Sequence, residues 1–261
     1  MDIERLFEGD TPLPSLNRLV QQLLSEFSSH DPDLLRIARI LSQDQALSAK
    51  VLRLANSAHF AGARQVDSIR DAAIMLGLNN LRMLVICSAV QQRFVTIPHL
   101  DLGRFWRQNL ACSQLAGRLA KRCRLDQEQA RLGGLLHSIG QLYIHQKEPR
   151  LAQQVVAKVA QGCPRAEVEK QLLEFDYGEV GAELARRWQF PASLALICRH
   201  HIRPDSAPEA SRPLVTVVAL ARWRVEQDMD APQLSWPDEA LNSLGLTREQ
   251  LYALGEAPTP A

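Results

Sequence analysis

The sequence lacks several features that commonly reveal a function. Its 30 Lys and Arg residues against 29 Asp and Glu residues leave a formal net charge of +1, so no excess of charge favours nucleic acid or an anionic membrane as a partner. The first residues, MDIERLFEGD, lack the basic and apolar segments of a signal peptide, and the most apolar stretch, Met83–Val90, is too short to span a bilayer. These absences predict a cytoplasmic protein without membrane insertion.

Cysteine pairs and common catalytic motifs are missing as well. The five cysteines are widely scattered and form no C-x-x-C pair, which favours reduced thiols over disulfides or a zinc site. The chain also contains no G-x-x-x-x-G-K-[ST] phosphate loop, no G-x-S-x-G elbow and no H-E-x-x-H zinc helix. We therefore predict no cofactor.

Apolar residues recur at helical spacing along almost the whole chain, and no alternating run of β-branched residues favours a sheet. The expected fold class is all-α. The first helices are expected to open near Pro14-Ser15, to run from an Asp31-Pro32-Asp33 cap to about Leu41, and to cover Ala46–Asn56, Ser68–Leu76 and Leu78–Arg93, with Gly77 ending the fourth. Later helices are expected at Phe105–Arg122, Gln127–His145, Arg150–Ala160, Arg165–Glu174, Tyr177–Gln189, Pro191–His201, Ser211–Asp228 and Thr247–Leu254. A hinge at Thr96–Leu102 would separate two lobes.

The stretch Gly133–Leu142, reading GGLLHSIGQL, has the shape of a metal-dependent phosphohydrolase motif in which an adjacent His and Asp supply two metal ligands. Here the step is His137-Ser138. A neutral hydroxyl is a poor ligand and cannot offset the charge of a metal ion. Because Leu136 and Ile139 flank the histidine, a hydrogen-bonded core residue is a more common role for His137 than a metal ligand.

The motifs LRLANSAHF and SIRDAAIMLG, separated by a short loop within Ile40–Gly77, are followed in order by FWRQNLACSQLAGRLA, GGLLHSIGQL and CRHH. Through them the chain from about Leu13 to Asp228 resembles the HDOD family of HD-related output domains. The resemblance implies a two-lobed helical fold whose second lobe is similar to HD and HD-GYP phosphohydrolases. It implies an N-terminal extension at 1–12, an N-terminal lobe at 13–97, an HD-like lobe at 98–230, and a C-terminal extension at 231–261.

The resemblance also indicates where the metal ligands of active relatives would fall. Their early histidine corresponds to Gln108, their His-Asp pair to His137-Ser138, and their late aspartate to Arg222. Only His137 keeps the ligand type, and Gln141 stands where active relatives often have lysine. Because metal catalysis needs a bound ion that activates water, these degenerate positions predict a site without catalytic residues or metal.

Two groups of basic residues are candidates for a binding rim. The first contains Arg118 and Arg122, and the second contains Arg199, His200, His201 and Arg203. They could bind a phosphate group or a protein partner. Basic residues near the end of a helix also suit its negative dipole end and often form a solvated face, so that alternative stays open.

From these features we expect a non-catalytic regulatory or output module of bacterial signal transduction, of the two-component or cyclic-dinucleotide kind. Its partners would be signalling proteins, such as a sensor kinase, a receiver or a cyclic-dinucleotide enzyme. One alternative is a divergent HD-type metal-dependent phosphohydrolase. Another is a sensor that binds a nucleotide second messenger as its ligand without turnover.

Overall fold

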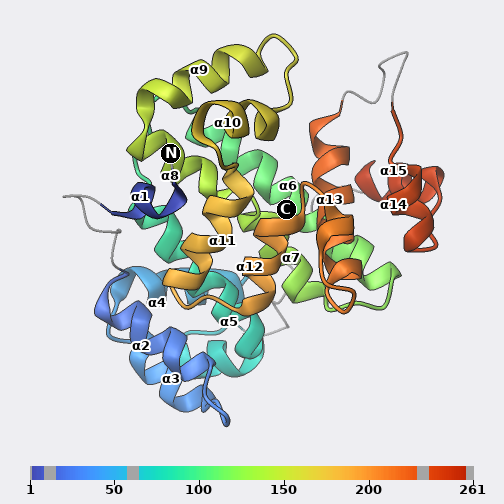
Figure 1. The fold of residues 1–261 in the computed structure, drawn as a ribbon. Coiled ribbons are helices and arrows are strands. Elements are labelled where there is room, and N and C mark those ends of the chain that lie inside the picture. Colours follow the sequence, from blue (N-terminus) through green and yellow to red (C-terminus); the bar gives the residue numbers. More distant parts are fainter. Residues whose placement is uncertain (1, 9–15, 58–64, 228–234, 257–261) are drawn as a thin grey trace. The chain divides into compact units, whose positions relative to one another are not determined.

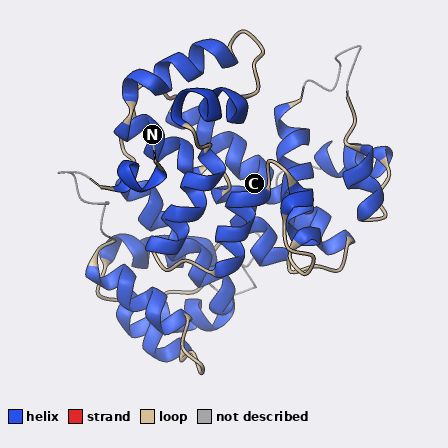
Figure 2. Cartoon of the chain, viewed as in Figure 1, coloured by secondary structure: helices blue, strands red, loops and turns tan. Residues whose placement is uncertain are grey.

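The fold is all-α, as the sequence predicts. The computed structural model describes residues 2–8, 16–57, 65–227 and 235–256, and every regular element in these ranges is helical (Figure 2). The described residues form two compact units. Unit 1 comprises residues 2–8, 96–227 and 235–256, and unit 2 comprises residues 16–57 and 65–95.

Unit 2 contains α2 (Arg18–Phe27), α3 (Leu34–Leu41), α4 (Gln45–Ala55) and α5 (Ile69–Arg93). Unit 1 contains α1 (Ile3–Phe7), α6 (Leu102–Arg122), α7 (Gln127–Leu136), α8 (Ile139–Lys147), α9 (Pro149–Val159), α10 (Arg165–Leu173), α11 (Tyr177–Arg187), α12 (Ala192–His200), the 3-10 turn η1 (Pro204–Ser206), α13 (Arg212–Glu226), α14 (Asp238–Ser243) and α15 (Arg248–Glu256) (Figure 1). The short α1, η1 and α14 were not predicted from the sequence.

The starts of the first two helices of unit 2 differ from the predicted ones. The predicted opening at Pro14-Ser15 lies outside the described residues, and α2 begins after Asn17, whose Oδ1 accepts a hydrogen bond from the Val20 N–H at 2.8 Å. Helix α3 is capped by Asp33 rather than Asp31, through a 2.8 Å bond from the Leu35 N–H. An extended residue with a short acceptor side chain satisfies the free N–H groups of the first turn, and Asp33 has both properties.

Helix α5 breaks at Gly77, as predicted. Ser68 caps it by accepting a 3.0 Å bond from the Asp71 N–H, and Gly77 has φ 72° and ψ 170°, which a residue with a Cβ rarely adopts. The 25-residue α5 is long and apolar enough to cross a membrane by length and composition, unlike the shorter stretch Met83–Val90. The core helix of a soluble protein passes the same test, so this finding is weak evidence for a span.

The predicted helix Gln127–His145 is two helices. Helix α7 ends at Leu136 and α8 begins at Ile139, with Ser138 at φ −105° and ψ 12° between them. The turn buries both His137 and Ser138 at 3% exposure. Helical periodicity alone could not reveal this break, because both helices carry apolar residues at similar spacing.

Unit 1 includes both ends of the described chain, which were predicted to be extensions. Leu241, Leu246 and Leu251 from the C-terminal segment join the hydrophobic core formed mainly by α6, α7, α12 and α13. At the other end, the Phe7 ring of α1 stacks on Tyr143 of α8, with the ring centroids 4.7 Å apart. The segments at 2–8 and 235–256 are therefore parts of unit 1, because their apolar side chains are buried there.

Candidate functional site

The His137-Ser138 step lies in the turn between α7 and α8, and both side chains are held by hydrogen bonds. The Nδ1–H of His137 donates to the Gly134 carbonyl at 2.9 Å, which leaves Nε2 without a proton in the neutral ring. The Ser138 hydroxyl donates to Oδ1 of Asn109 on α6 at 3.0 Å. The step is thus anchored to its own helix and to α6.

All four positions that were matched to former metal ligands line one cavity of about 50 Å³ in unit 1. The cavity is lined by Phe105, Gln108, Asn109, Cys112, His137, Ser138, Gln141, Arg222, Val225 and Glu226. These residues come from α6, the α7–α8 turn, α8 and α13. Tertiary packing therefore brings these four positions together, although the sequence separates the first and last by more than a hundred residues.

The positive charge of the cavity comes from Arg222, which projects from α13. Its Nη1 lies 2.7 Å from Oε2 of Glu226 one turn later, and its side chain is 23% exposed. Burial acts to lower the pKa of Arg222, but the neighbouring Tyr177 and Glu226 outweigh burial, and the net direction is upward. The guanidinium therefore stays charged.

A pair of neutral histidines lies at the cavity, with His137 in its lining and His201 packed against His137. The rings of His137 and His201 meet edge to face with centroids 4.9 Å apart. Burial, and after it the charge of Arg222, lowers the pKa of His137 to about 3, and burial also lowers that of His201. His201 donates from Nδ1 to the Cys198 carbonyl at 2.8 Å and accepts at Nε2 from the Tyr177 hydroxyl at 3.2 Å. Both histidines are uncharged at neutral pH.

The residues of the cavity do not fit a divalent metal ion. Only His137, Cys112 and Glu226 among them are of a ligand type, and the described residues contain no group of three or more His, Cys, Asp or Glu that could hold a metal. Burial raises the pKa of the Cys112 thiol, which disfavours the thiolate that binds metals. Arg222 adds a fixed positive charge that opposes a cation.

Sequence reasoning missed Asn109 and Glu226. Asn109 is 4% exposed, and its Nδ2 has no hydrogen-bond partner among the described residues. Glu226 lies four residues after Arg222 and so on the same face of α13, whereas Asn109 only adjoins Gln108 in the sequence. Their side chains enter the site only through the packing of α6 and α13, which no local pattern shows.

The predicted binding rim divides into separate groups. Arg199, His200 and Arg203 line a second pocket of about 270 Å³, together with Lys170, Asp176, Glu179, Ile202 and Ser206. Arg118 and Arg122 lie on α6 and do not line this pocket. His201 is fully buried, so its assignment to the rim is wrong. Its ring points to the core because His201 directly follows His200 at the end of α12, and successive residues in helical conformation project in different directions.

Within the second pocket the acidic residues are already paired. Lys170 Nζ lies 2.5 Å from Oε2 of Glu179 and 3.7 Å from Oδ2 of Asp176. His200 Nδ1 donates to the Ser206 hydroxyl at 2.8 Å, and partial burial, followed by the charge of Arg199, lowers the pKa of His200. Arg199 and Arg203 are exposed, and neither is in an ion pair among the described residues.

The described helices define an all-α protein, and its first cavity brings Gln108, His137, Ser138 and Arg222 together. The model of the HDOD domain family matches residues 13–204. The chain belongs to the HDOD domain family.

Solved structures similar to this chain include a protein from Shewanella amazonensis described as a candidate phosphohydrolase. It is 35% identical, with a TM-score of 0.77, and the match covers 94% of this chain and 89% of that one. An HDOD domain protein of unknown function from Geobacter sulfurreducens is 26% identical, with a TM-score of 0.77 and coverage of 97% and 85%.

The chain is also similar to an uncharacterised protein from Treponema pallidum. The two are 26% identical over 245 residues, which is 91% of this chain. The chain spans only 47% of the length of that relative.

Proposed function

We propose that this protein is a cytoplasmic, non-catalytic regulatory module of bacterial signal transduction that acts by binding a protein partner. The observation that carries the proposal is the Arg222 guanidinium. It lines the same cavity as His137 and Ser138, where a phosphohydrolase would need divalent ions, and a fixed cation opposes their binding. Membership of a family of HD-related output domains supports the regulatory role.

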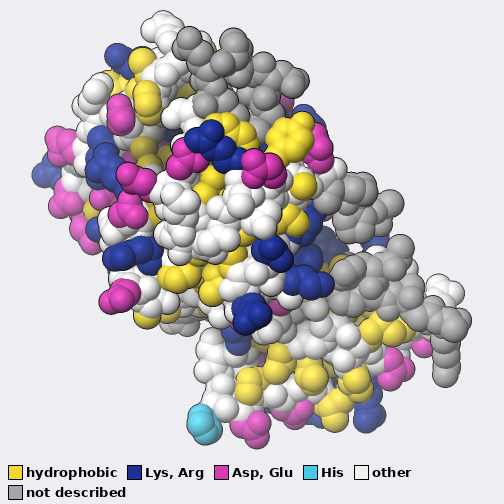
Figure 3. All heavy atoms as spheres, turned by 90° about the vertical axis from the view of Figure 1, so that its right-hand side faces the viewer, with side chains coloured by type: hydrophobic (Ala, Val, Ile, Leu, Met, Phe, Trp, Pro, Cys, Tyr) yellow, Lys and Arg dark blue, Asp and Glu magenta, His cyan; other side chains and the backbone are white. Residues whose placement is uncertain are grey.

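The surface proposed for the partner is the pocket around Arg199 and Arg203. Both guanidinium groups are exposed, and Arg side chains are suited to pairing with carboxylates and phosphates. The face in Figure 3 carries Lys and Arg interspersed with Asp and Glu. The partner would present acidic or phosphorylated side chains, as the acidic site of a receiver domain or a phosphorylated sensor kinase does.

Cross-linking in the native cells tests this proposal. Lys170 lines the same pocket, so an amine-reactive cross-linker should join it to the bound partner. We expect mass spectrometry to identify a kinase, a receiver or a cyclic-dinucleotide enzyme linked to Lys170, and the double variant Arg199→Glu/Arg203→Glu to reduce its recovery by about tenfold.

The matched control is Arg150→Glu, which reverses an exposed charge on α9, outside the pocket. It should leave recovery unchanged. Equal recovery with the double variant and with the wild type would contradict the proposed surface.

A divergent phosphohydrolase is the second candidate, favoured by the description of the Shewanella amazonensis relative. Metal analysis of the purified protein separates the two functions. Near-stoichiometric iron, manganese or zinc that is lost in His137→Ala would support the enzyme and refute the non-catalytic module. A metal content that is equally low in both proteins would support the module.

A further inference from the structure

The cavity at the His137-Ser138 step contains two buried hydrogen-bond donors without a partner among the described residues. One is Nδ2 of Asn109, whose Oδ1 is already used by the Ser138 hydroxyl. The other is Nε of Arg222, whose Nη1 is used by Glu226. Leaving a buried donor unpaired costs roughly 1–3 kcal/mol, so two such donors on one cavity indicate a missing acceptor.

The charge that favours an anionic acceptor comes from Arg222, and the rest of the lining is neutral apart from one carboxylate. Gln108 and Gln141 add two amide groups, and both are partly exposed. His137 is neutral and contributes no charge. The one carboxylate, Glu226, is 44% exposed, so it can remain hydrated while a ligand occupies the inner side of Arg222.

Size and access are suited to a small group. A cavity needs roughly 10–15 Å³ of water-accessible space to hold one water, and this cavity provides about 50 Å³. Asn109, His137 and Ser138 form its buried end, whereas Gln108, Gln141 and Arg222 are partly exposed and form its open end.

We propose that this cavity binds a tetrahedral oxyanion, either inorganic phosphate or the phosphoryl group of a phosphate monoester. Nε of Arg222 and Nδ2 of Asn109 donate to its oxygens, and the Arg222 guanidinium supplies the charge. Arg is well matched to this role because its planar donors form charge-assisted hydrogen bonds with phosphate. The site goes beyond the proposed partner binding, since it lies apart from the Arg199 pocket.

Binding of inorganic phosphate to the purified full-length protein tests the proposal, with ³¹P NMR titration and thermal unfolding as readouts. Ionic strength is held constant with chloride. Wild type should show saturable broadening of the phosphate signal and a rise in Tm, because a ligand of the folded state stabilises it. Arg222→Gln and Asn109→Asp should each weaken binding by about tenfold or more, since one removes the charge and the other replaces a donor by an anionic oxygen.

Asn109→Asp keeps the oxygen that accepts from the Ser138 hydroxyl, so this variant should remain folded. Circular dichroism would detect any misfolding that could itself cause a loss of binding. Arg150→Gln, on α9 and outside both pockets, should bind phosphate like the wild type. Absence of saturable binding in the wild type would overturn the proposal, and so would undiminished binding in both cavity variants.

A second arm uses a nucleoside monophosphate. Competition between it and phosphate would identify the ligand as a phosphate monoester, whereas binding of phosphate alone would identify the free anion. Either result supports the site. Hydrolysis of the monoester would refute the proposed non-catalytic function but would not contradict the oxyanion site. The experiment therefore tests the two proposals independently.

Discussion

His137 shows how burial can convert a residue of a catalytic type into a structural one. Its Nδ1 bonds to the Gly134 carbonyl and its ring packs against His201, so the imidazole has the partners of a core residue. Its pKa of about 3 reflects burial first and the Arg222 charge second. The core role that the sequence favoured for His137 agrees with this geometry.

This pKa predicts a dependence of stability on pH. The unfolded state binds a proton below about 6.5, whereas folded His137 does so only near 3, so this residue makes the protein less stable as pH falls below 6.5. His137→Asn keeps a donor for the Gly134 carbonyl but does not titrate. From pH 7.5 to pH 5, we expect the wild type to lose about 2 kcal/mol more unfolding free energy than His137→Asn.

Urea unfolding at the two pH values measures this difference. The comparison between proteins is needed because burial raises the pKa of Glu169 to about 7, which stabilises the folded state as pH falls towards 4.5 and opposes the histidine effect. If the unfolding free energies of the two proteins changed equally with pH, the lowered pKa of His137 would be contradicted.

At the scale of elements, the glycines of GGLLHSIGQL set how closely helices pack. A Cβ on Gly134 would lie 2.7 Å from Cα of Ser113 on α6, and one on Gly140 would lie 2.0 Å from the Tyr177 carbonyl oxygen on α11. Neither backbone can move away cheaply. The motif that suggested a lost catalytic site is thus also required for the crossings of α7 with α6 and of α8 with α11.

Gly140→Ala should therefore destabilise the protein by about 3 kcal/mol or more, because the methyl group forces α8 and α11 apart. The control is Gly117→Ala on α6, where the three heavy atoms nearest to the added Cβ all belong to the side chain of Arg131. That side chain can rotate, and alanine favours the helix, so we expect a change within about 1 kcal/mol. Thermal unfolding of both variants tests the pair, and equal effects would argue against a backbone clash at Gly140.

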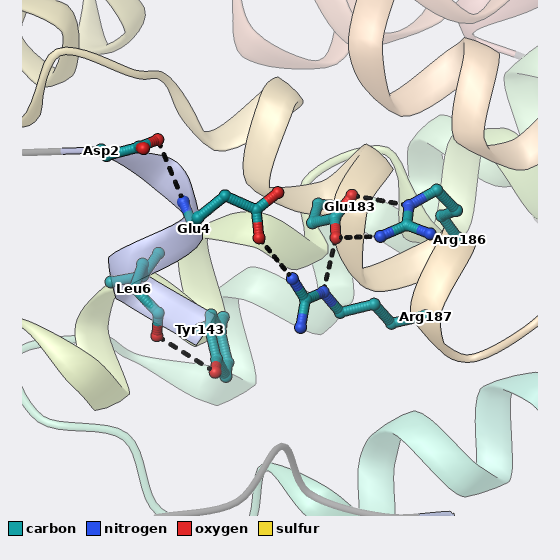
Figure 4. Close-up of polar contacts among 7 residues, drawn as sticks. All are labelled: Asp2, Glu4, Leu6, Tyr143, Glu183, Arg186 and Arg187. Carbon is teal, nitrogen blue, oxygen red and sulfur yellow. Dashed lines mark hydrogen bonds and ion pairs between the residues drawn. The ribbon is translucent and has the colours of Figure 1, made fainter. Parts of the chain in front are cut away.

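On the scale of the whole molecule, unit 1 is built from segments that lie on both sides of unit 2 in the sequence. Figure 4 shows the N-terminal contact, in which Glu4 pairs with Arg187 at 2.9 Å and the Tyr143 hydroxyl donates to the Leu6 carbonyl at 3.4 Å. The Arg187 guanidinium also lies over the Phe7 ring, 4.6 Å from its centroid. Helix α1, which precedes unit 2 in the chain, is therefore packed into unit 1.

Phe7→Ala should loosen α8 and α11, which are more than a hundred residues away in sequence. Because Phe7 is 6% exposed, we expect a loss of about 3 kcal/mol in the unfolding free energy of unit 1. Hydrogen exchange should accelerate in α8 and α11 and stay unchanged in α3 and α4. Glu4→Gln removes only an exposed ion pair and should cost less than about 1 kcal/mol. Faster exchange confined to α1 would show that its docking is dispensable.

The sequence by itself determined the helical class, the Gly77 break and a last helix that opens at Thr247. There Thr247 and Gln250 form a capping box, in which each residue's backbone N–H donates to the other's side chain at 3.2 Å. The sequence also determined which degenerate positions belong together, through the resemblance to a known family. Such features depend on residues a few positions apart or on recognisable motifs. Local chemistry specifies them before any packing occurs.

Only the tertiary structure decided which side chains share the cavity and which are buried. The α7–α8 turn, the unpaired donor of Asn109 and the burial of His201 all depend on contacts between α6, α8, α11, α12 and α13. Hydrophobic spacing marks the apolar face of a helix but not the partner against which it packs. The environment of each polar group was therefore set by which helices meet, and that is a property of the folded chain.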